Sequence, residues 1–325
     1  MNRRPRRNQN LKRQLARTAT RQMMPRGRPR RAIRPRRRQS SLLPLLILLV
    51  LIALIVGYFF LWQDDGSEAY VSQDVYVHFI DVGQGDSTLI VTSGGTVLID
   101  GGDNHMGTRV VNYLRNANVN TLSYVVATHP HADHIGGLIE VVNQFEIGAI
   151  MMPPVAHTTN TFERFIDAIE LNNIPVVAPE LGGTFSLGGA VFTILGPDNP
   201  GCGNLNNCSI VLRMDYGNNS FLFTADIEVD VENRLVENFN DYLSVDVLRV
   251  AHHGSRTSTS TRFLEAVDPQ MAVISLGANN NFGHPHEVVM QRLTYKDIYI
   301  FRTDYQGHIV MSTDGTTISV SGGNN

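Results

Sequence analysis

The sequence predicts an α/β domain in which two β-sheets pack face to face and helices cover the outer faces. From about residue 74 onward, many short apolar runs rich in Val, Ile and Phe have strand length, and most end in Gly, Asn or Asp. Five segments with helical periodicity are interspersed among them. Because strands outnumber helices, a two-sheet arrangement with external helices is favoured. Residues 74–325, about 250 in number, suffice for one domain with a substantial core.

The predicted strands are 75–80, 87–91, 96–99, 122–127, 191–195, 210–214, 221–223, 245–250 and 271–275, and the predicted helices are 107–117, 134–145, 161–171, 228–238 and 286–293.

Charge divides the chain into a basic segment and an acidic one. Residues 1–41 hold 16 of the 27 lysines and arginines and no acidic residue, so the rest has 11 basic residues against all 30 acidic ones. Such a split is typical of a basic tail attached to an acidic globular domain. Prolines among its arginines predict that the tail is disordered. A role in setting membrane topology and contacting anionic headgroups is favoured over nucleic-acid binding.

An uncharged, apolar stretch, residues 42–62, follows this tail. As a helix it would span roughly 30 Å, the thickness of a bilayer core. It ends in aromatic residues including Trp62, and Asp64 and Asp65 follow at once. We expect a transmembrane signal anchor with a cytoplasmic N-terminus, a linker at 63–73, and a domain outside the cytoplasm. A cleaved signal peptide is the alternative, but it would have a shorter apolar region and a small-residue cleavage site.

Three imidazoles and one carboxylate lie within residues 128–134, directly after the predicted strand 122–127. Imidazole nitrogen and carboxylate oxygen both bind Zn²⁺ at about 2.0 to 2.2 Å. His129 and His131, two residues apart, can point at one ion, whereas Asp133 and His134 can reach a second. The alternative is a group of loop histidines with ordinary hydrogen bonds, which is disfavoured because chance clusters of this density are rare.

Two later segments supply further candidate ligands. Asp226 follows the predicted strand 221–223 and suits a bridging carboxylate, with a helix cap as its alternative role. His252 and His253 follow the run 245–250, and one of them is expected to bind metal; His252 is preferred because it lies nearer the strand end. A polar turn is the alternative. The candidate ligands for two divalent ions, zinc or manganese, are thus His129, His131, Asp133, His134, Asp226, His252 and His253.

Residues 129–134 form the pattern HxHxDH, in which the chain resembles the metallo-β-lactamase fold hydrolases. More narrowly, residues 79–87 (FIDVGQGDS), 98–102, 206–209, 252–255 and 283–285 are similar to the hydrolase domain of ComEC-type DNA uptake proteins. The resemblance implies a metallo-β-lactamase-like αββα sandwich, a divalent metal site and, by analogy, phosphodiester hydrolysis of DNA. It does not extend to the multi-span channel of those proteins, so DNA translocation is not implied.

The chain departs from the wider family at one metal ligand. Many relatives place a third histidine for the first metal between the HxHxDH motif and the bridging Asp. Here that stretch contains only His157, and the matching strand start reads Asn207-Cys208-Ser209, a pattern that the ComEC-like group shares. We therefore expect a weaker first metal site that is completed by water or by Asn207, and an unequal pair of sites.

Asp133 and His284 are the candidate catalytic residues. Two cations about 3.5 to 4 Å apart would lower the pKa of a shared water and neutralise a developing oxyanion, and Asp133 would help to hold them. His284, in a loop rich in Asn and Gly, can donate to the oxyanion or the leaving oxygen, although ordering its loop is nearly as good an interpretation. Asp81 and Asp100 are expected to orient ligands and loop glycines, and His78 is expected at the surface.

We expect a membrane-anchored, extracytoplasmic, metal-dependent hydrolase that acts on phosphodiesters, and nucleic acid is the favoured substrate. An acidic domain repels DNA at long range, but bound metals would add local positive charge. The alternatives are a phosphorylcholine-type esterase, a lactam or ester hydrolase, and a non-catalytic metal-binding surface module. Cys202 and Cys208 form a small disulfide outside the membrane or remain thiols inside a cell.

Overall fold

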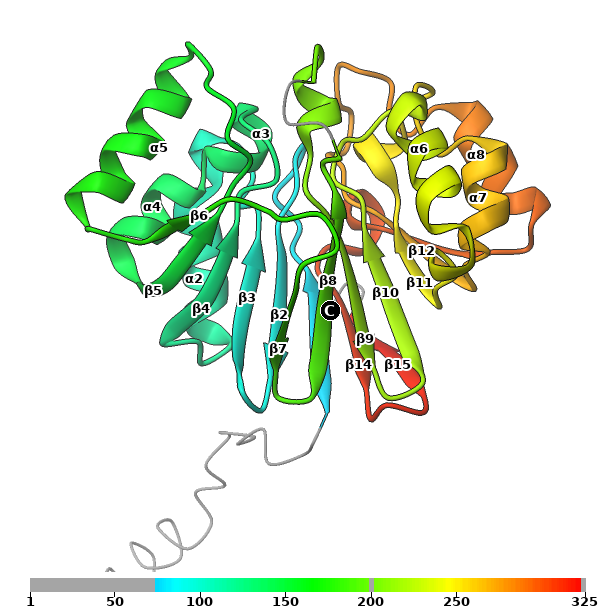
Figure 1. Ribbon diagram of the computed structural model, residues 1–325, viewed down its shortest axis with the longest axis horizontal. Helices are drawn as coiled ribbons and strands as arrows, with labels where there is room; N and C mark the ends of the chain where they lie inside the picture. The colour runs from blue at the N-terminus through cyan, green and yellow to red at the C-terminus, as the bar shows by residue number, and fades with distance from the viewer. Residues whose placement is uncertain (1–73, 199–201, 323–325) are drawn as a thin grey trace, which may run out of the picture. The chain divides into compact units, whose positions relative to one another are not determined.

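The computed structural model describes residues 74–198 and 202–322, which form two mixed β-sheets packed face to face with helices on both outer faces (Figure 1). The first sheet has the order β15-β14-β1-β2-β3-β4-β5-β6 and the second β13-β12-β11-β10-β9-β8-β7. The predicted sandwich is therefore confirmed for this part of the chain.

The first sheet contains β1 (Val75–Phe79), β2 (Thr88–Thr92), β3 (Gly95–Ile99), β4 (Thr121–Val126), β5 (Glu146–Met151), β6 (Val176–Val177), β14 (Ile309–Thr313) and β15 (Ile318–Ser321). The second contains β7 (Thr184–Leu187), β8 (Ala190–Gly196), β9 (Val211–Tyr216), β10 (Asn219–Phe223), β11 (Val247–Arg249), β12 (Met271–Ile274) and β13 (Tyr299–Arg302). The helices are α2 (Gly107–Asn116), α3 (Ala132–Ile135), α4 (Leu138–Gln144), α5 (Asn160–Leu171), α6 (Val229–Phe239), α7 (Thr261–Val267), α8 (Glu287–Tyr295) and α9 (Thr303–Gln306).

Three apolar layers hold these elements together. The middle layer lies between the sheets, where fully buried rings such as Phe79, Phe192 and Phe221 pack. In a second layer, buried side chains such as Leu114 pack α2, α4 and α5 on the first sheet. In a third layer, buried side chains such as Phe263 pack α6, α7 and α8 on the second sheet. Each fully buried large side chain contributes about 1.5 to 3 kcal/mol by leaving water, so the sheets form a firm platform for the loops at their edge.

The predicted helix 134–145 is interrupted in the structure. It is divided into α3 and α4 at Gly136 and Gly137. A Cβ on Gly137 would lie 2.0 Å from the carbonyl oxygen of Gly101, so only glycine permits this close approach. The break allows α3 to carry the end of the HxHxDH motif while α4 packs on the sheet.

His78 does not lie at the surface as expected. It is 5% exposed, because β1 points it toward α2, where its Nδ1 is 2.9 Å from the hydroxyl of Tyr113. The alternation of residues along a strand places His78 on the face that α2 covers, and a helix covering that strand could not be inferred from the strand's own sequence.

In residues 74–198 and 202–322, no helix is both long and apolar enough to cross a membrane. The predicted tail (1–41), transmembrane anchor (42–62) and linker (63–73) all lie outside the described residues.

Candidate metal centre

Loops at one edge of both sheets supply the candidate ligands. β3 pairs in parallel with β4, and β10 in parallel with β11, so the carboxyl ends of each pair lie side by side. The loop after β4 carries the HxHxDH motif, the loop after β10 carries Asp226, and the loop after β11 carries His252 and His253. The two edges are tied together where the Ile210 N–H donates to the Thr128 carbonyl at 3.0 Å.

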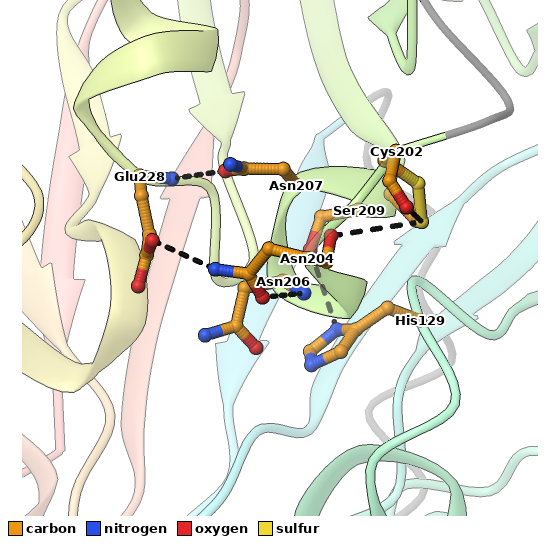
Figure 2. Close-up of a disulfide and its surroundings, with 8 residues drawn as sticks. His129, Cys202, Asn204, Asn206, Asn207, Ser209 and Glu228 are labelled. Carbon is orange, nitrogen blue, oxygen red and sulfur yellow. Dashed lines mark hydrogen bonds between the residues drawn. A yellow bond between two sulfur atoms is a disulfide. The ribbon is translucent and has the colours of Figure 1, made fainter. Parts of the chain in front are cut away.

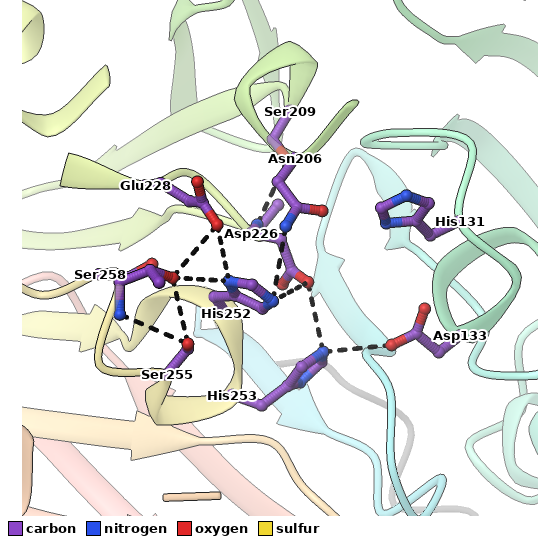
Figure 3. Close-up of polar contacts among 12 residues, drawn as sticks. His131, Asp133, Asn206, Ser209, Asp226, Glu228, His252, His253, Ser255 and Ser258 are labelled. Atoms are coloured by element: carbon purple, nitrogen blue, oxygen red, sulfur yellow. Dashed lines mark hydrogen bonds and ion pairs between the residues drawn. The ribbon is translucent and has the colours of Figure 1, made fainter. Parts of the chain in front are cut away.

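Four of the predicted ligands form one compact group. Single ligand atoms from Asp133, His134, Asp226 and His253 all lie within 4.8 Å of one another. Figure 3 shows three of these residues, Asp133, Asp226 and His253. Nε2 of His253 is 3.3 Å from Asp133 Oδ2 and 3.4 Å from Asp226 Oδ2. Nε2 of His134 is 3.3 Å from the same oxygen of Asp226. Asp226 is therefore central to the group, as expected for a bridging carboxylate.

A hydrogen bond at Nδ1 orients each of the two imidazoles of this group. Nδ1 of His134 is 2.7 Å from Asp100 Oδ2, and Nδ1 of His253 is 2.8 Å from the Ser275 carbonyl. Each Nδ1–H therefore donates to a fixed acceptor, which turns Nε2 toward the centre, and this is the usual support of metal-binding histidines. Asp100 also accepts from the backbone and the hydroxyl of Thr128. The predicted role of Asp100 in orienting a histidine agrees with this geometry.

The carboxylates make the group favourable for positive charge. Burial alone would lower the pKa of His134, but Asp226, Asp100 and Asp133 raise it well above its ordinary value. Burial likewise opposes protonation of His253, yet Asp226 and Asp133 raise its pKa to about 10. Without an ion these rings hold protons beside the carboxylates, and a divalent cation would replace those protons.

Unpartnered atoms at the centre fit such a cation. Within the described ranges, Nε2 of His134, Nε2 of His253 and Oδ1 of Asp226 are buried without a hydrogen-bond partner. Two imidazole nitrogens and two carboxylates are a suitable donor set for Zn²⁺ or Mn²⁺, so the residues present fit a metal ion.

His129 and His131 form a second, adjacent group. Nε2 of His129 is 3.1 Å from Nδ1 of His131, and the rings of His129 and His134 are 4.1 Å apart. Burial lowers the pKa of both His129 and His131 below the ordinary value. Neutral imidazoles whose nitrogens converge can share one cation, as the HxH spacing predicted.

The preference for His252 over His253 does not match the geometry. His253 is 1% exposed and belongs to the compact group, whereas Nε2 of His252 is 3.8 Å from Asp226 and 3.5 Å from Nδ2 of Asn206. The cause is the backbone, because both histidines have left-handed conformations, with φ of 50° and 54°. This sharp turn directs the two rings to different sides, so the distance of a histidine from the strand end does not predict which ring is the metal ligand. Such strained conformations are often found at functional sites.

Sequence reasoning missed two buried charged residues behind the group, Asp86 and Arg249. Arg249, 2% exposed, forms an ion pair with Asp86, and its Nη1 donates to the Ala225 carbonyl at 2.6 Å. Asp86 also lies 3.9 Å from Nδ1 of His134. A single arginine in the apolar run 245–250 could have indicated this ion pair, because a charged side chain is buried only when it is paired.

Glycine brings the Asp86 loop against the HxHxDH motif. The backbone N–H of Asp86 donates to the Asp133 carbonyl at 3.1 Å. Gly85 has φ of +142°, and a Cβ there would lie 2.4 Å from that same carbonyl oxygen. The loop 80–87 can therefore approach Asp133 only with glycine at this position.

Two other expected residues lie beside the group rather than in it. The ring of His284 is 5.7 Å from that of His252 and 6.2 Å from that of His253. Burial, followed by the neighbouring histidines, lowers the pKa of His284 to about 4. Asp81 accepts from the Gly83 N–H at 3.0 Å and pairs with Arg109 at 2.6 Å. Asp81 thus orders the glycine loop, as expected, and among the described residues its side chain forms no hydrogen bond or ion pair with a candidate histidine ligand.

Cys202 and Cys208 are joined in a disulfide beside the site (Figure 2). The bond closes the segment that ends in the short 3₁₀ helix η2 (Leu205–Cys208). Asn207, the expected substitute ligand, has its Oδ1 engaged by the Glu228 backbone N–H at 3.0 Å. Ser209 instead contacts the metal-site residues, because its hydroxyl is 3.3 Å from Nδ1 of His129 and accepts from the Asp226 N–H.

Residues 80–278 match the family model described as the metallo-beta-lactamase superfamily, and the chain belongs to this superfamily. The described sheets, outer helices and convergent His and Asp side chains agree with that membership.

Relatives narrow the comparison to competence proteins. ComE operon protein 3 of Bacillus subtilis is 30% identical over 289 residues, which cover 83% of this chain and 36% of that protein. Recombination protein 2 of Haemophilus influenzae is 32% identical over 67% of this chain and 26% of its own length. Competence protein ComA of Neisseria gonorrhoeae is 32% identical over 74% of this chain and 32% of its own length. The resemblance to the ComEC-type hydrolase domain is confirmed, and the chain spans only about a third of these relatives.

Solved structures are more distant. The diiron β-hydroxylase CmlA of Streptomyces venezuelae has a TM-score of 0.49 at 15% identity, over 74% of this chain and 54% of that one. The metallo-beta-lactamase fold protein YhfI of Bacillus subtilis has a TM-score of 0.45 at 12% identity, over 70% and 95%. Nothing about activity follows from likenesses this weak.

Proposed function

We propose that this chain is a membrane-anchored, extracytoplasmic metal-dependent hydrolase that cleaves phosphodiesters, with DNA as its substrate. The observation that carries the proposal is the compact group of Asp133, His134, Asp226 and His253. Within the described part of the chain, Nε2 of both histidines and Oδ1 of Asp226 are buried without a hydrogen-bond partner. The names of the relatives, two for competence operons or proteins and one for recombination, support DNA as the substrate.

The residues divide into two ion sites that share one carboxylate. His129 and His131 would hold one ion, and the compact group would hold the other, with Asp226 between them. When bound, the two ions would supply a water of lowered pKa and positive charge for the developing oxyanion. Asp100 and the Ser275 carbonyl keep the ligand rings of His134 and His253 in place.

His284 has the position of a substrate-binding group. Its ring lies beside His252 and His253 at the edge of the site, and its Nδ1 has no hydrogen-bond partner in the residues that the structure describes. Because its pKa is lowered to about 4, the ring is neutral near pH 7. A neutral imidazole donates one hydrogen bond, which suits a phosphate oxygen or the leaving oxygen.

Membrane anchoring is proposed from residues 42–62 and the arginine-rich tail alone. The excess of arginine before the apolar stretch favours a cytoplasmic N-terminus. Alkaline phosphatase is active only outside the cytoplasm, so we expect a fusion of this enzyme after residue 325 to be active in cells. An inactive fusion of normal abundance would contradict the extracytoplasmic location.

The enzymatic proposal is tested with the full chain, purified in mild detergent and supplied with Mn²⁺ or Zn²⁺. We expect metal-dependent cleavage of DNA and of bis-p-nitrophenyl phosphate, and at least a hundredfold loss in Asp133→Ala, because this change removes a ligand. Asp167→Ala, at a position outside the site, is the control. Cleavage of a chromogenic lactam or of a phosphorylcholine ester alone would favour the alternative hydrolases. Bound metal without turnover of any substrate would favour a binding module.

A further inference from the structure

Among the described residues, no third His, Cys, Asp or Glu forms a ligand group with His129 and His131. Nε2 of His129 and Nδ1 of His131 converge at 3.1 Å, whereas Asp226 belongs to the compact group. His157, the nearest sequence candidate, is half-buried with its ring 6.1 Å from that of His131, but its Nδ1 is engaged by the hydroxyl of Thr159 at 3.1 Å. Catalytic metal sites usually have three protein ligands and an open position, so another donor at this side of the site would complete the set.

Asn206 has the properties of that donor. Its side chain is 9% exposed, and its Oδ1 is buried without a hydrogen-bond partner in residues 74–198 and 202–322. Nδ2 of Asn206 faces Nε2 of His252 at 3.5 Å. The oxygen then points to the side on which His129 and His131 lie (Figures 2 and 3).

The loop holds Asn206 in this position by several independent contacts. Asn204 Oδ1 accepts from the Asn206 N–H at 3.0 Å, and Asn207 is fixed to Glu228. The disulfide between Cys202 and Cys208 closes the same segment. Ser209, three residues after Asn206, contacts His129. One rigid turn therefore sets both the His129 ring and the amide oxygen.

We propose that Oδ1 of Asn206 is the third protein ligand of the first metal site, where most of the superfamily would have a histidine. The inference rests on the proposed two-metal site and names its missing ligand. Carbonyl oxygen is a harder donor than imidazole and suits Mn²⁺ better than a third imidazole would. The first site therefore binds its ion more weakly than the compact group and discriminates less strongly against Mn²⁺.

The test is metal binding without substrate. The full chain is stripped with a chelator and titrated with Mn²⁺ alone or Zn²⁺ alone, by calorimetry and by elemental analysis after dialysis. The wild type should bind two ions, the second more weakly. Asn206→Ala should weaken the second ion at least tenfold and leave the first unchanged. Asn206→Asp, which keeps the oxygen, should retain the weakly bound second ion. Asn206→His should raise the affinity of the His129 and His131 site for Zn²⁺ relative to Mn²⁺.

His157→Ala is the matched control and should bind both ions as the wild type does; thermal melting of each variant checks its folding. Two ions bound to Asn206→Ala with wild-type affinities would overturn the inference, and so would a wild type that binds one ion only. Loss of the second ion in His157→Ala but not in Asn206→Ala would also overturn it. Two bound ions without phosphodiester cleavage would contradict the proposed function alone.

Discussion

At the residue scale, His252 and His253 are neighbours in the sequence but have different surroundings. The hydrogen bond to the Ser275 carbonyl directs the His253 ring into the compact group. Nδ1 of His252 instead lies 3.3 Å from Oγ1 of Thr257 and 3.7 Å from Oε1 of Glu228. Their left-handed backbone separates the two rings. A variant at each position therefore distinguishes a ligand from its neighbour.

We expect His253→Ala to lose the tightly bound ion, with at least a hundredfold weaker affinity, because a ligand and a buried partner of Asp226 disappear together. His252→Ala should keep that ion within about tenfold, the lower end of effects seen when groups behind a ligand are changed. Metal content after dialysis measures both. The opposite pattern, with His252 essential and His253 dispensable, would show that the rings are assigned to the wrong roles.

His78 provides a pH prediction remote from the metal centre. Burial, with His308 adding to it, lowers the pKa of His78 to about 4. Above pH 6.5 neither the folded nor the unfolded state is protonated there, so His78 adds no pH dependence. Between pH 6.5 and 4 the unfolded state takes up a proton that the folded state refuses, and stability falls by up to about 3 kcal/mol.

His78→Asn should flatten this part of the profile, since asparagine does not titrate and can still reach Tyr113. Urea unfolding at several pH values between 7 and 4 gives the free energy of unfolding. The control is His105→Asn, whose side chain is 71% exposed. Equal slopes for wild type and His78→Asn would refute the assignment of this acid sensitivity to His78.

The sequence revealed residue types better than side-chain directions. Asp133, His134 and Asp226 were predictable because an unusual density of ligands follows strand ends. The choice of His253 depends on a left-handed turn, and the place of Asp86 depends on the path of a glycine loop. Neither conformation is encoded in the spacing of the ligands, so neither could be inferred from the motif.

At the element scale, α6 and α7 hold the loop that follows the two histidines. Glu232 on α6 is fully buried and accepts from the backbone N–H groups of Thr259 and, at 2.9 Å, Ser260. These are free N–H groups at the start of α7, where a carboxylate is favourable. One side chain thus joins α6, α7 and the end of the loop 251–260.

Glu232→Gln should destabilise the fold by about 1 to 3 kcal/mol, because the amide NH₂ replaces one acceptor and leaves a buried N–H unsatisfied. Urea unfolding of the metal-free chain measures the change. Glu237→Gln, on the same helix at an exposed ion pair with Arg262, is the matched control and should change stability by less than about 1 kcal/mol. Equal effects of the two substitutions would contradict the role given to Glu232.

Elements in the middle of the sheets were easier to predict than those at their edges. Every predicted strand has a counterpart, and the central strands β10 and β11 are buried along their whole length. The missed strands include β5, β13 and β15, which have partly or fully exposed positions and mix polar with apolar residues, and β6, which is two exposed valines. Their pairing depends on neighbouring strands, which a single segment does not reveal.

At the scale of the whole domain, the candidate metal centre joins the two sheets. Asp133 and His134 come from the first sheet, and Asp226 and His253 from the second. A cation held by all four would link the sheets directly, and it would satisfy atoms that otherwise lack partners among the described residues. Metal binding should therefore stabilise the folded domain as a whole.

Mn²⁺ or Zn²⁺ at about one hundred times its dissociation constant should add about 2.7 kcal/mol to the free energy of unfolding. For a domain of this size that is roughly 5 to 10 °C in Tm. Calorimetric scans with and without the ion, and after chelation, measure the shift. Asp133→Ala should abolish most of it. A metal-induced shift of the same size in that variant would place the stabilising ion elsewhere.

The position of a bound ion tests most directly whether this group is a metal centre. Crystals of the full chain grown with Mn²⁺ would be measured at a wavelength where manganese scatters anomalously. We expect an anomalous peak about 2.0 to 2.3 Å from Nε2 of His134, Nε2 of His253 and oxygens of Asp133 and Asp226. A fully soaked crystal with no peak there, or with its only peak on other residues, would contradict it.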